Sequence, residues 1–244
     1  FEELLAAMRT PEVKAALLTE TSVPHEFPGT MENGIAQVEL NFDQTYVLDQ
    51  AMDYEPTQTQ SFAALAATKQ QNSWEFFYDY LVAADGCQTA VMFFTNYSDH
   101  NLDAVHDMLM DETTVTGLSD AGAHVSLIFD AVAPTYQLTY WGRDRTRGAT
   151  LPLPHLIHRQ TLKNAQLFGF HDRGSLEIGK RADINVIDFD NLKLGKMELH
   201  YDLPAGGARF LQGASGYIAT LVNGVQTRSY DQDTGARPGR LLRS

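Results

Sequence analysis

The stretch Thr113–His124, with the sequence TTVTGLSDAGAH, has the strongest bearing on the fold. Its first half, Thr113 to Leu118, is short and rich in β-branched residues, which is typical of a buried strand. Its second half is small and polar and places Asp120 directly after that strand. A carboxylate at a strand end lies at the rim of a sheet, where α/β folds bind their ligands. An ordinary Asx turn or helix cap is the alternative interpretation of Asp120.

Working outward from this stretch, strand and helix patterns alternate. Strand patterns occur at 35–40, 46–48, 89–95 and 113–118, and helix patterns at 1–18, 61–70, 74–84, 101–110 and 151–169. We expect the first helix to be interrupted at Thr10-Pro11, Ser73 to cap the helix that follows it, and Gly169 to end the last one. Alternating elements with short connections predict an α/β fold with a parallel sheet.

The pattern changes near Gly174. Beyond it, glycines separate short β-type runs, of which Ala182–Asp188 and Tyr217–Val222 are the clearest strands. Asn223-Gly224 after the second strand is typical of a two-residue hairpin turn. We therefore predict two domains, an α/β part over 1–173 and strands with an extended tail over 174–244.

Composition excludes several classes of protein. The 244 residues carry 18 Lys and Arg against 31 Asp and Glu, a formal net charge of −13. Binding to nucleic acid or to an anionic membrane needs a basic surface, so neither is expected. The single cysteine, Cys87, excludes an internal disulfide and a zinc site made of cysteines alone. We expect a cytoplasmic, bacterial protein, since the chain shows no signal-peptide pattern.

Other candidate site residues each have a structural alternative. His124 lies four residues after Asp120, but two ligands are too few for zinc, and a hydrogen-bonded structural histidine is the alternative. Arg143 and Arg145 stand out in an acidic chain and could hold a substrate carboxylate. An ion-pair network with Asp144 is the alternative for both.

Several motifs together resemble a known family. Thr116–Val125 looks like the last barrel strand of the amidohydrolase superfamily, and Thr161–Gly169 resembles the helix that follows it. Asp172–Asp188 resembles the entry into the small β-sandwich of that superfamily, and Leu221–Val225 is similar to its closing hairpin. The branch most similar is the N-acyl-D-amino-acid deacylase (D-aminoacylase) branch. Its further motifs are Asn96-Tyr97, Trp141–Arg145, Asp202–Gly206 and Thr234–Gly239.

The resemblance implies a fold and a reaction. The fold would be the C-terminal part of a TIM-barrel metal-dependent hydrolase with strands of a β-sandwich. The reaction would be hydrolysis of the amide of an N-acyl-D-amino acid with zinc as the cofactor. Asp120 would be both a zinc ligand and the group that moves the catalytic proton, while Asn96 and Tyr97 could line the substrate pocket.

The sequence also departs from the family. Its members are longer, and the H-x-H, the Cys or modified Lys and the two later His that they carry ahead of this region have no counterparts here. We therefore expect this chain alone to be inactive and to require a complementary N-terminal segment or a second copy of itself as partner. Stoichiometric tight zinc with turnover would contradict that expectation.

Two other functions remain open. One is a different amidohydrolase branch, such as a cyclic-amide hydrolase or a deaminase. The other is a non-enzymatic β-rich binding domain, for which a stable monomer without a metal is expected. An H-x-H upstream of Phe1 would favour a hydrolase over the binding domain.

Overall fold

The computed structural model divides the chain into two units, residues 1–104 and residues 105–244. It describes residues 1–21, 40–48, 52–117, 119, 121–128 and 130–241. The predicted strand at 35–40 lies almost entirely outside these residues. No helix in the described ranges has the length and apolar character that crossing a membrane would require.

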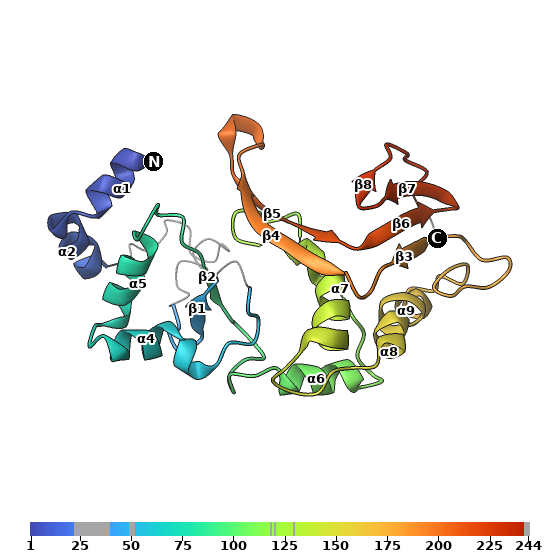
Figure 1. Cartoon of the computed structure of the whole chain (residues 1–244), viewed down its shortest axis with the longest axis horizontal. Coiled ribbons are helices and arrows are strands. Elements are labelled where there is room, and N and C mark those ends of the chain that lie inside the picture. The colour runs from blue at the N-terminus through green and yellow to red at the C-terminus, as the bar shows by residue number, and fades with distance from the viewer. Residues whose placement is uncertain (22–39, 49–51, 118, 120, 129, 242–244) are drawn as a thin grey trace. The chain divides into compact units, whose positions relative to one another are not determined.

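The first unit consists of short helices and one two-stranded ladder (Figure 1). Its elements are α1 Glu2–Met8, α2 Pro11–Thr19, β1 Thr45–Val47, the 3₁₀ turn η1 Gln58–Gln60, α4 Phe62–Thr68, α5 Ser73–Leu81 and β2 Ala90–Met92. The predicted interruption at Thr10-Pro11 is confirmed, because Thr10 is the N-cap residue of α2 and Pro11 opens the helix. The Thr10 hydroxyl does not cap α2; it donates to the Ala7 carbonyl of the preceding helix instead.

The predicted N-cap of α5 is wrong by one residue. Asn72 is the N-cap, and its side-chain oxygen accepts the Trp74 backbone N–H at 2.8 Å. Ser73 is already the first helical residue. Asparagine and serine are about equally good caps, so the choice between adjacent candidates depends on where the incoming loop leaves the extended conformation.

Aromatic side chains form the core of the first unit. Phe62 is fully buried against Phe77 and Tyr80 of α5, with ring centroids 5.2 and 5.1 Å away. Tyr46 of β1 is also buried, 5.9 Å from the ring of Tyr97. Offset and edge-on ring pairs of this kind are favourable beyond the area they bury, so this core holds β1 and β2 against α4 and α5.

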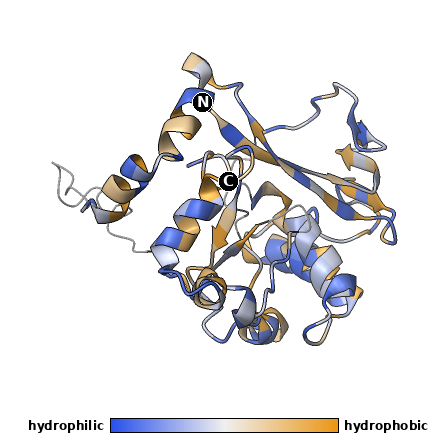
Figure 2. Ribbon diagram, turned by 60° about the vertical axis from the view of Figure 1, so that its left-hand side comes forward, coloured by the Kyte–Doolittle hydropathy of each residue, from blue (hydrophilic) through white to orange (hydrophobic). Residues whose placement is uncertain are grey.

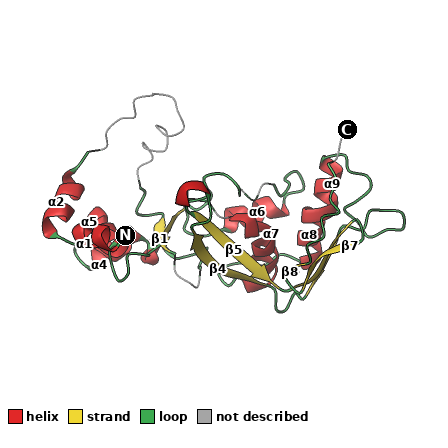
Figure 3. Ribbon diagram, turned by 90° about the horizontal axis from the view of Figure 1, so that it is seen from above, coloured by secondary structure: helices red, strands yellow, loops and turns green. Residues whose placement is uncertain are grey.

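The second unit begins with helices and ends with strands (Figure 3). Its helical elements are α6 Asp103–Met110, η2 Asp130–Val132, α7 Ala133–Tyr136, η3 Gln137–Asp144, α8 Leu153–His158, η4 Arg159–Lys163, α9 Asn164–Leu167 and η5 Pro204–Gly206. Its strands are β3 Ile184–Ile187, β4 Lys193–His200, β5 Arg209–Ser215, β6 Tyr217–Val222, β7 Val225–Ser229 and β8 Gln232–Asp233. The segments η3 and η4 are π-helical and continue α7 and α8 without a break.

Two local predictions in this unit are confirmed. Gly169 ends α9 with φ +70°, and the N–H groups of Gly169 and Phe170 donate to Gln166 and Ala165, which is a Schellman motif. Asn223 and Gly224 form the two-residue turn between β6 and β7, both with positive φ. The strand beginning at Tyr217 also has the bounds that its sequence predicted.

The expectation of a parallel sheet is wrong for the described residues. β1 pairs with β2, β3 with β6, β6 with β7, β7 with β8, and β4 with β5, and every one of these pairings is antiparallel. Residues 113–117, predicted as a buried strand, have no ladder partner in the described chain, and Val115 is 39% exposed. A strand requires a neighbour to pair with, which an apolar pattern alone does not provide.

The content is nevertheless that of a mixed helix and strand protein, as predicted. The four-stranded sheet β3-β6-β7-β8 and the ribbon β4-β5 both follow the helical part of the unit. Hydrophilic and hydrophobic residues are mixed along the long β4-β5 ribbon (Figure 2), and α7 packs against β4. No barrel closes among the described strands.

Candidate functional site

Asp120, the predicted catalytic residue and metal ligand, lies outside the described residues. Its neighbours Ser119 and Ala121 are described, as is the turn that follows. In that turn the carbonyl of His124 accepts the N–H groups of Leu127 and Ile128. The His124 side chain is exposed and its backbone φ is +48°, so His124 here shapes a tight turn, and its contribution to a substrate site stays a prediction.

The structure places Asn96 and Tyr97 in the first unit. Asn96 is exposed, with φ +61°. Tyr97 is fully buried, stacks on Phe93 at 4.3 Å between centroids, and donates its hydroxyl to the Pro56 carbonyl. Tyr97 thus belongs to the aromatic core of this unit, and a pocket-lining role for the pair stays a prediction.

Arg143 binds backbone of the loop between β3 and β4. Its guanidinium donates to the carbonyls of Phe189, Asp190 and Leu192 and bonds both carboxylate oxygens of Asp144. The hydrogen bond from Asp144 raises the pKa of Arg143 above its ordinary value. The ion pair that was the structural alternative is therefore present in the structure.

Arg145 is buried beside an aromatic ring. Only 5% of it is exposed, its guanidinium carbon lies 4.8 Å from the centre of the Trp141 ring, and Nη1 donates to the Ala149 carbonyl. Gly148 permits this position, because a Cβ there would come within 2.4 Å of the guanidinium. Both arginines thus hold structure of the second unit, and their role toward a substrate carboxylate stays a prediction.

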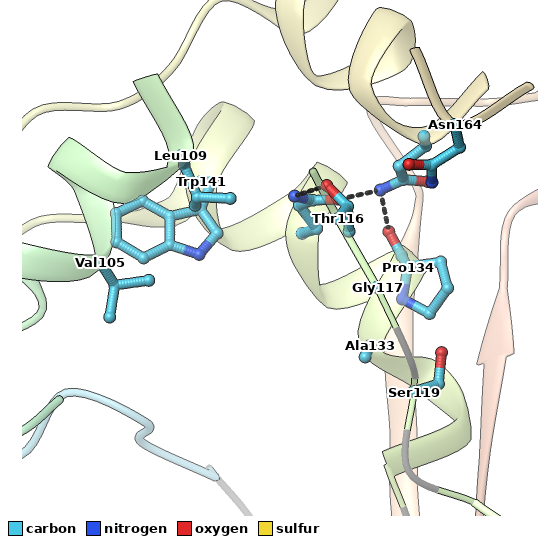
Figure 4. Close-up of a pocket in the computed structure, with 11 residues that line it drawn as sticks. Val105, Leu109, Thr116, Gly117, Ser119, Ala133, Pro134, Trp141 and Asn164 are labelled. Carbon is cyan, nitrogen blue, oxygen red and sulfur yellow. Dashed lines mark hydrogen bonds between the residues drawn. The ribbon is translucent and has the colours of Figure 1, made fainter. Parts of the chain in front are cut away.

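The segment just before Asp120 lines a cavity of about 310 Å³. Its wall residues come from α6, the 116–119 segment, α7 with η3, and η4 with α9: Val105, Leu109, Thr116, Gly117, Ser119, Ala133, Pro134, Gln137, Trp141, Gln160 and Asn164. Figure 4 shows Val105, Leu109 and Trp141 at one end, and Thr116 and Asn164 at the other. The cavity thus has an apolar end and a polar end, as ligand pockets commonly do.

Carboxamides dominate the polar end. Gln160 donates through Nε2 to the Gln137 side-chain oxygen at 2.6 Å and to the Pro134 carbonyl at 2.9 Å. Gln137 in turn donates to the Thr116 hydroxyl oxygen at 3.2 Å. These bonds fix the orientation of both glutamines. Two π-helical segments provide Gln137, Trp141 and Gln160, and such segments are frequent at functional sites.

A stripe of basic side chains holds the chain that leads into this cavity. Spaced four residues apart on α8 and η4, they bind carbonyls at the end of α6 and just beyond it: His155 to Leu109, Arg159 to Asp111 and Lys163 to Glu112. Arg159 is 1% exposed and also donates to the Thr114 hydroxyl at 2.7 Å. Burial lowers the pKa of its guanidinium. Cations are favourable at a helix C-terminus, so this stripe anchors residues 109–114.

Sequence reasoning missed the residues that make the cavity polar. Gln137, Gln160 and Asn164 are uncharged and belong to no catalytic motif. The one available signal was the spacing of Gln160 and Asn164, which places two carboxamides on the same face of a helix. Which face turned inward was not visible in the pattern.

No group of three or more His, Cys, Asp or Glu side chains that could hold a metal ion occurs among the residues that the structure describes. The described residues therefore do not fit a zinc centre by themselves, and no chemical step is derived through a metal here.

Comparison with known proteins gives a family. The model of a family described as the amidohydrolase family matches residues 2–228. No curated protein and no solved structure matches the chain. The resemblance of the motifs to the amidohydrolase superfamily is confirmed by this match, which spans nearly the whole chain. The chain belongs to the amidohydrolase family, a family of hydrolases.

Proposed function

We propose that this chain is part of a zinc-dependent enzyme that hydrolyses the amide bond of N-acyl-D-amino acids. Family membership provides the hydrolase character. The motifs at Asn96-Tyr97, Trp141–Arg145, Asp202–Gly206 and Thr234–Gly239 favour the D-aminoacylase branch. The main structural support is that the segment entering Asp120 lines a cavity with one apolar and one polar end.

Asp120 is the proposed proton carrier. A carboxylate beside the scissile amide can accept the proton of the attacking water and deliver it to the leaving amine. Amidohydrolases generally use metal ions, and zinc with Asp120 as one ligand remains part of the proposal. The other ligands would come from outside the described residues. A partner segment and a cytoplasmic location are likewise proposed.

The test is an assay of the protein that carries this sequence, with zinc added, on four substrate classes: N-acyl-D-amino acids, their L-enantiomers, hydantoins and dihydropyrimidines. We expect release of the D-amino acid, with the L-enantiomers at least about tenfold slower, a gap that a difference of about 1.4 kcal/mol in transition-state binding produces. Asp120→Asn should abolish turnover. Asp107→Asn, at an exposed carboxylate of α6, is the matched control and should leave it unchanged.

Each other outcome favours a different function. Ring opening of hydantoins or dihydropyrimidines without deacylation would replace this proposal with a cyclic-amide hydrolase. No turnover of any of the four classes, together with a stable monomer that binds no zinc, would favour the β-rich binding domain.

A further inference from the structure

Asn164 carries a buried oxygen without a donor in the described structure. Its side-chain Oδ1 is shielded from solvent and accepts no hydrogen bond, while its carboxamide lies on the wall of the 310 Å³ cavity. A buried acceptor without a donor costs about 1–3 kcal/mol. A group inside the cavity that donates an N–H or O–H would remove that cost.

Thr116 presents the complementary group at the same end of the cavity (Figure 4). Its hydroxyl oxygen accepts a hydrogen bond from Gln137 Nε2 at 3.2 Å. A hydroxyl that accepts one bond retains a proton to donate. The polar end therefore offers an acceptor on Asn164 and a donor on Thr116.

The neighbouring glutamines cannot satisfy Asn164 while they keep their own bonds. Gln160 uses Nε2 on both Gln137 and Pro134, and Gln137 directs its own Nε2 to Thr116. These bonds hold the two glutamines in one orientation. The donor that Asn164 requires must therefore come from a molecule in the cavity.

The opposite end of the cavity argues against water alone as the occupant. Val105, Leu109 and Trp141 form this end, and they offer a water molecule no hydrogen-bond acceptor of their own. Ordered water requires two or more polar partners. An apolar chain would instead gain from burial there. A volume of about 310 Å³ also lies at the small end of ligand pockets.

We infer that this cavity binds an apolar secondary amide, with its N–H donated to Asn164, its carbonyl accepting from Thr116, and its acyl chain against Val105, Leu109 and Trp141. The identification of that amide with the acyl side of an N-acyl amino acid rests on the proposed function. The binding site itself rests on the cavity. The volume restricts the acyl chain to a short or medium length.

Trp141 provides the readout. The chain contains two tryptophans, of which Trp74 is 51% exposed on α5 and Trp141 lines the cavity. Trp74→Phe leaves Trp141 as the sole fluorescent indole. This variant is titrated with N-methylhexanamide and, as a matched probe without an N–H, with methyl hexanoate. We expect a saturable fluorescence change, with the amide binding about tenfold more tightly than the ester.

Further substitutions in this background separate the two polar contacts. Asn164→Leu should remove the preference for the amide over the ester. Gln166→Leu, at an exposed position on the same helix, is the matched control and should keep it. Thr116→Val should weaken the amide and the ester alike, because both carry a carbonyl. Thr116→Val also provides an independent test if the Asn164 variant does not fold.

Equal affinity for the amide and the ester in the Trp74→Phe protein would overturn the inference, and so would the absence of any saturable response. If the amide preference holds but N-acyl-D-amino acids are not hydrolysed, the proposed function fails and the binding site stands. If hydrolysis occurs but amide and ester bind alike, the binding site fails and the proposed function stands.

Discussion

Arg159 is the residue on which the approach to the cavity depends most. It donates to the Asp111 carbonyl at 3.1 Å and to the Thr114 hydroxyl at 2.7 Å, and it is almost fully buried. Its Nε has no acceptor in the described structure. A buried cation with incomplete partners adds less stability than its bonds suggest, since burial itself is costly.

Removal of Arg159 should nonetheless destabilise the protein, because two buried groups lose their donor. We expect Arg159→Met to lower the free energy of unfolding by about 2–4 kcal/mol, measured by urea denaturation. His158→Ala, at the exposed neighbouring position, is the control, with a change below about 0.5 kcal/mol. A neutral Arg159→Met variant would show that the cost of burying the guanidinium cancels its hydrogen bonds.

Asp172 makes a second residue-scale contribution, which depends on pH. Hydrogen bonds first from Arg173 and then from Arg181 lower the pKa of its carboxyl from 3.8 to about 2. The folded pKa is below the unfolded one, so the carboxylate stabilises the folded state fully above the ordinary value of 3.8. This stabilisation is lost as the pH falls toward 2.

The pH prediction concerns the steepness of acid destabilisation between pH 4 and 2. The Asp172→Asn variant should lose less stability over this range than the parent, measured by urea denaturation at each pH. In Arg173→Gln, NMR titration of the Asp172 carboxyl should give a pKa closer to 3.8 than in the parent. An unchanged titration in Arg173→Gln would contradict the assignment of the shift to Arg173.

At the scale of elements, the N-cap of α5 gives a direct comparison between two adjacent residues. The Asn72 side chain accepts the Trp74 N–H, whereas Ser73 is inside the helix. We expect Asn72→Ala to cost about 1 kcal/mol of unfolding free energy, measured by thermal or urea unfolding. Ser73→Ala should be neutral or slightly stabilising, because alanine has the higher helix propensity. The reverse order would restore Ser73 as the cap.

Elements were predictable from sequence where a local signal defines them. The turn at Asn223-Gly224 and the Schellman motif at Gly169 depend on residues that accept positive φ. The segment 113–117 shows the opposite case, because its β-branched residues match a strand but find no partner to pair with in the described chain. Strand pairing depends on distant segments, so local pattern could not decide it.

At the scale of the whole molecule, large apolar side chains remain uncovered in the second unit. Phe168 is 70% exposed, Leu176 is 83% exposed and Ile178 is fully exposed. Together they span the end of α9 and the loop that follows. Exposed apolar surface of this kind favours association.

We expect the purified chain to associate with further copies as its concentration rises, measured by light scattering coupled to size-exclusion chromatography. Leu176→Gln combined with Ile178→Gln should shift the equilibrium toward monomer by removing apolar area. Exposed Lys196 carries no apolar area at its charged end, so Lys196→Gln serves as the control. A monomer at every concentration would contradict this expectation.

The sequence by itself determined what neighbouring residues decide: the helix interruption at Thr10-Pro11, the end of α9, the β6–β7 turn and the family motifs. Propensity, capping and turn chemistry act within a few residues, so a linear pattern contains them. Only the tertiary structure decided that the strand pairs are antiparallel and that Arg143 and Arg145 bind their own unit. It alone brought Thr116, Trp141 and Asn164 around one cavity, because burial depends on contacts between segments far apart in the chain.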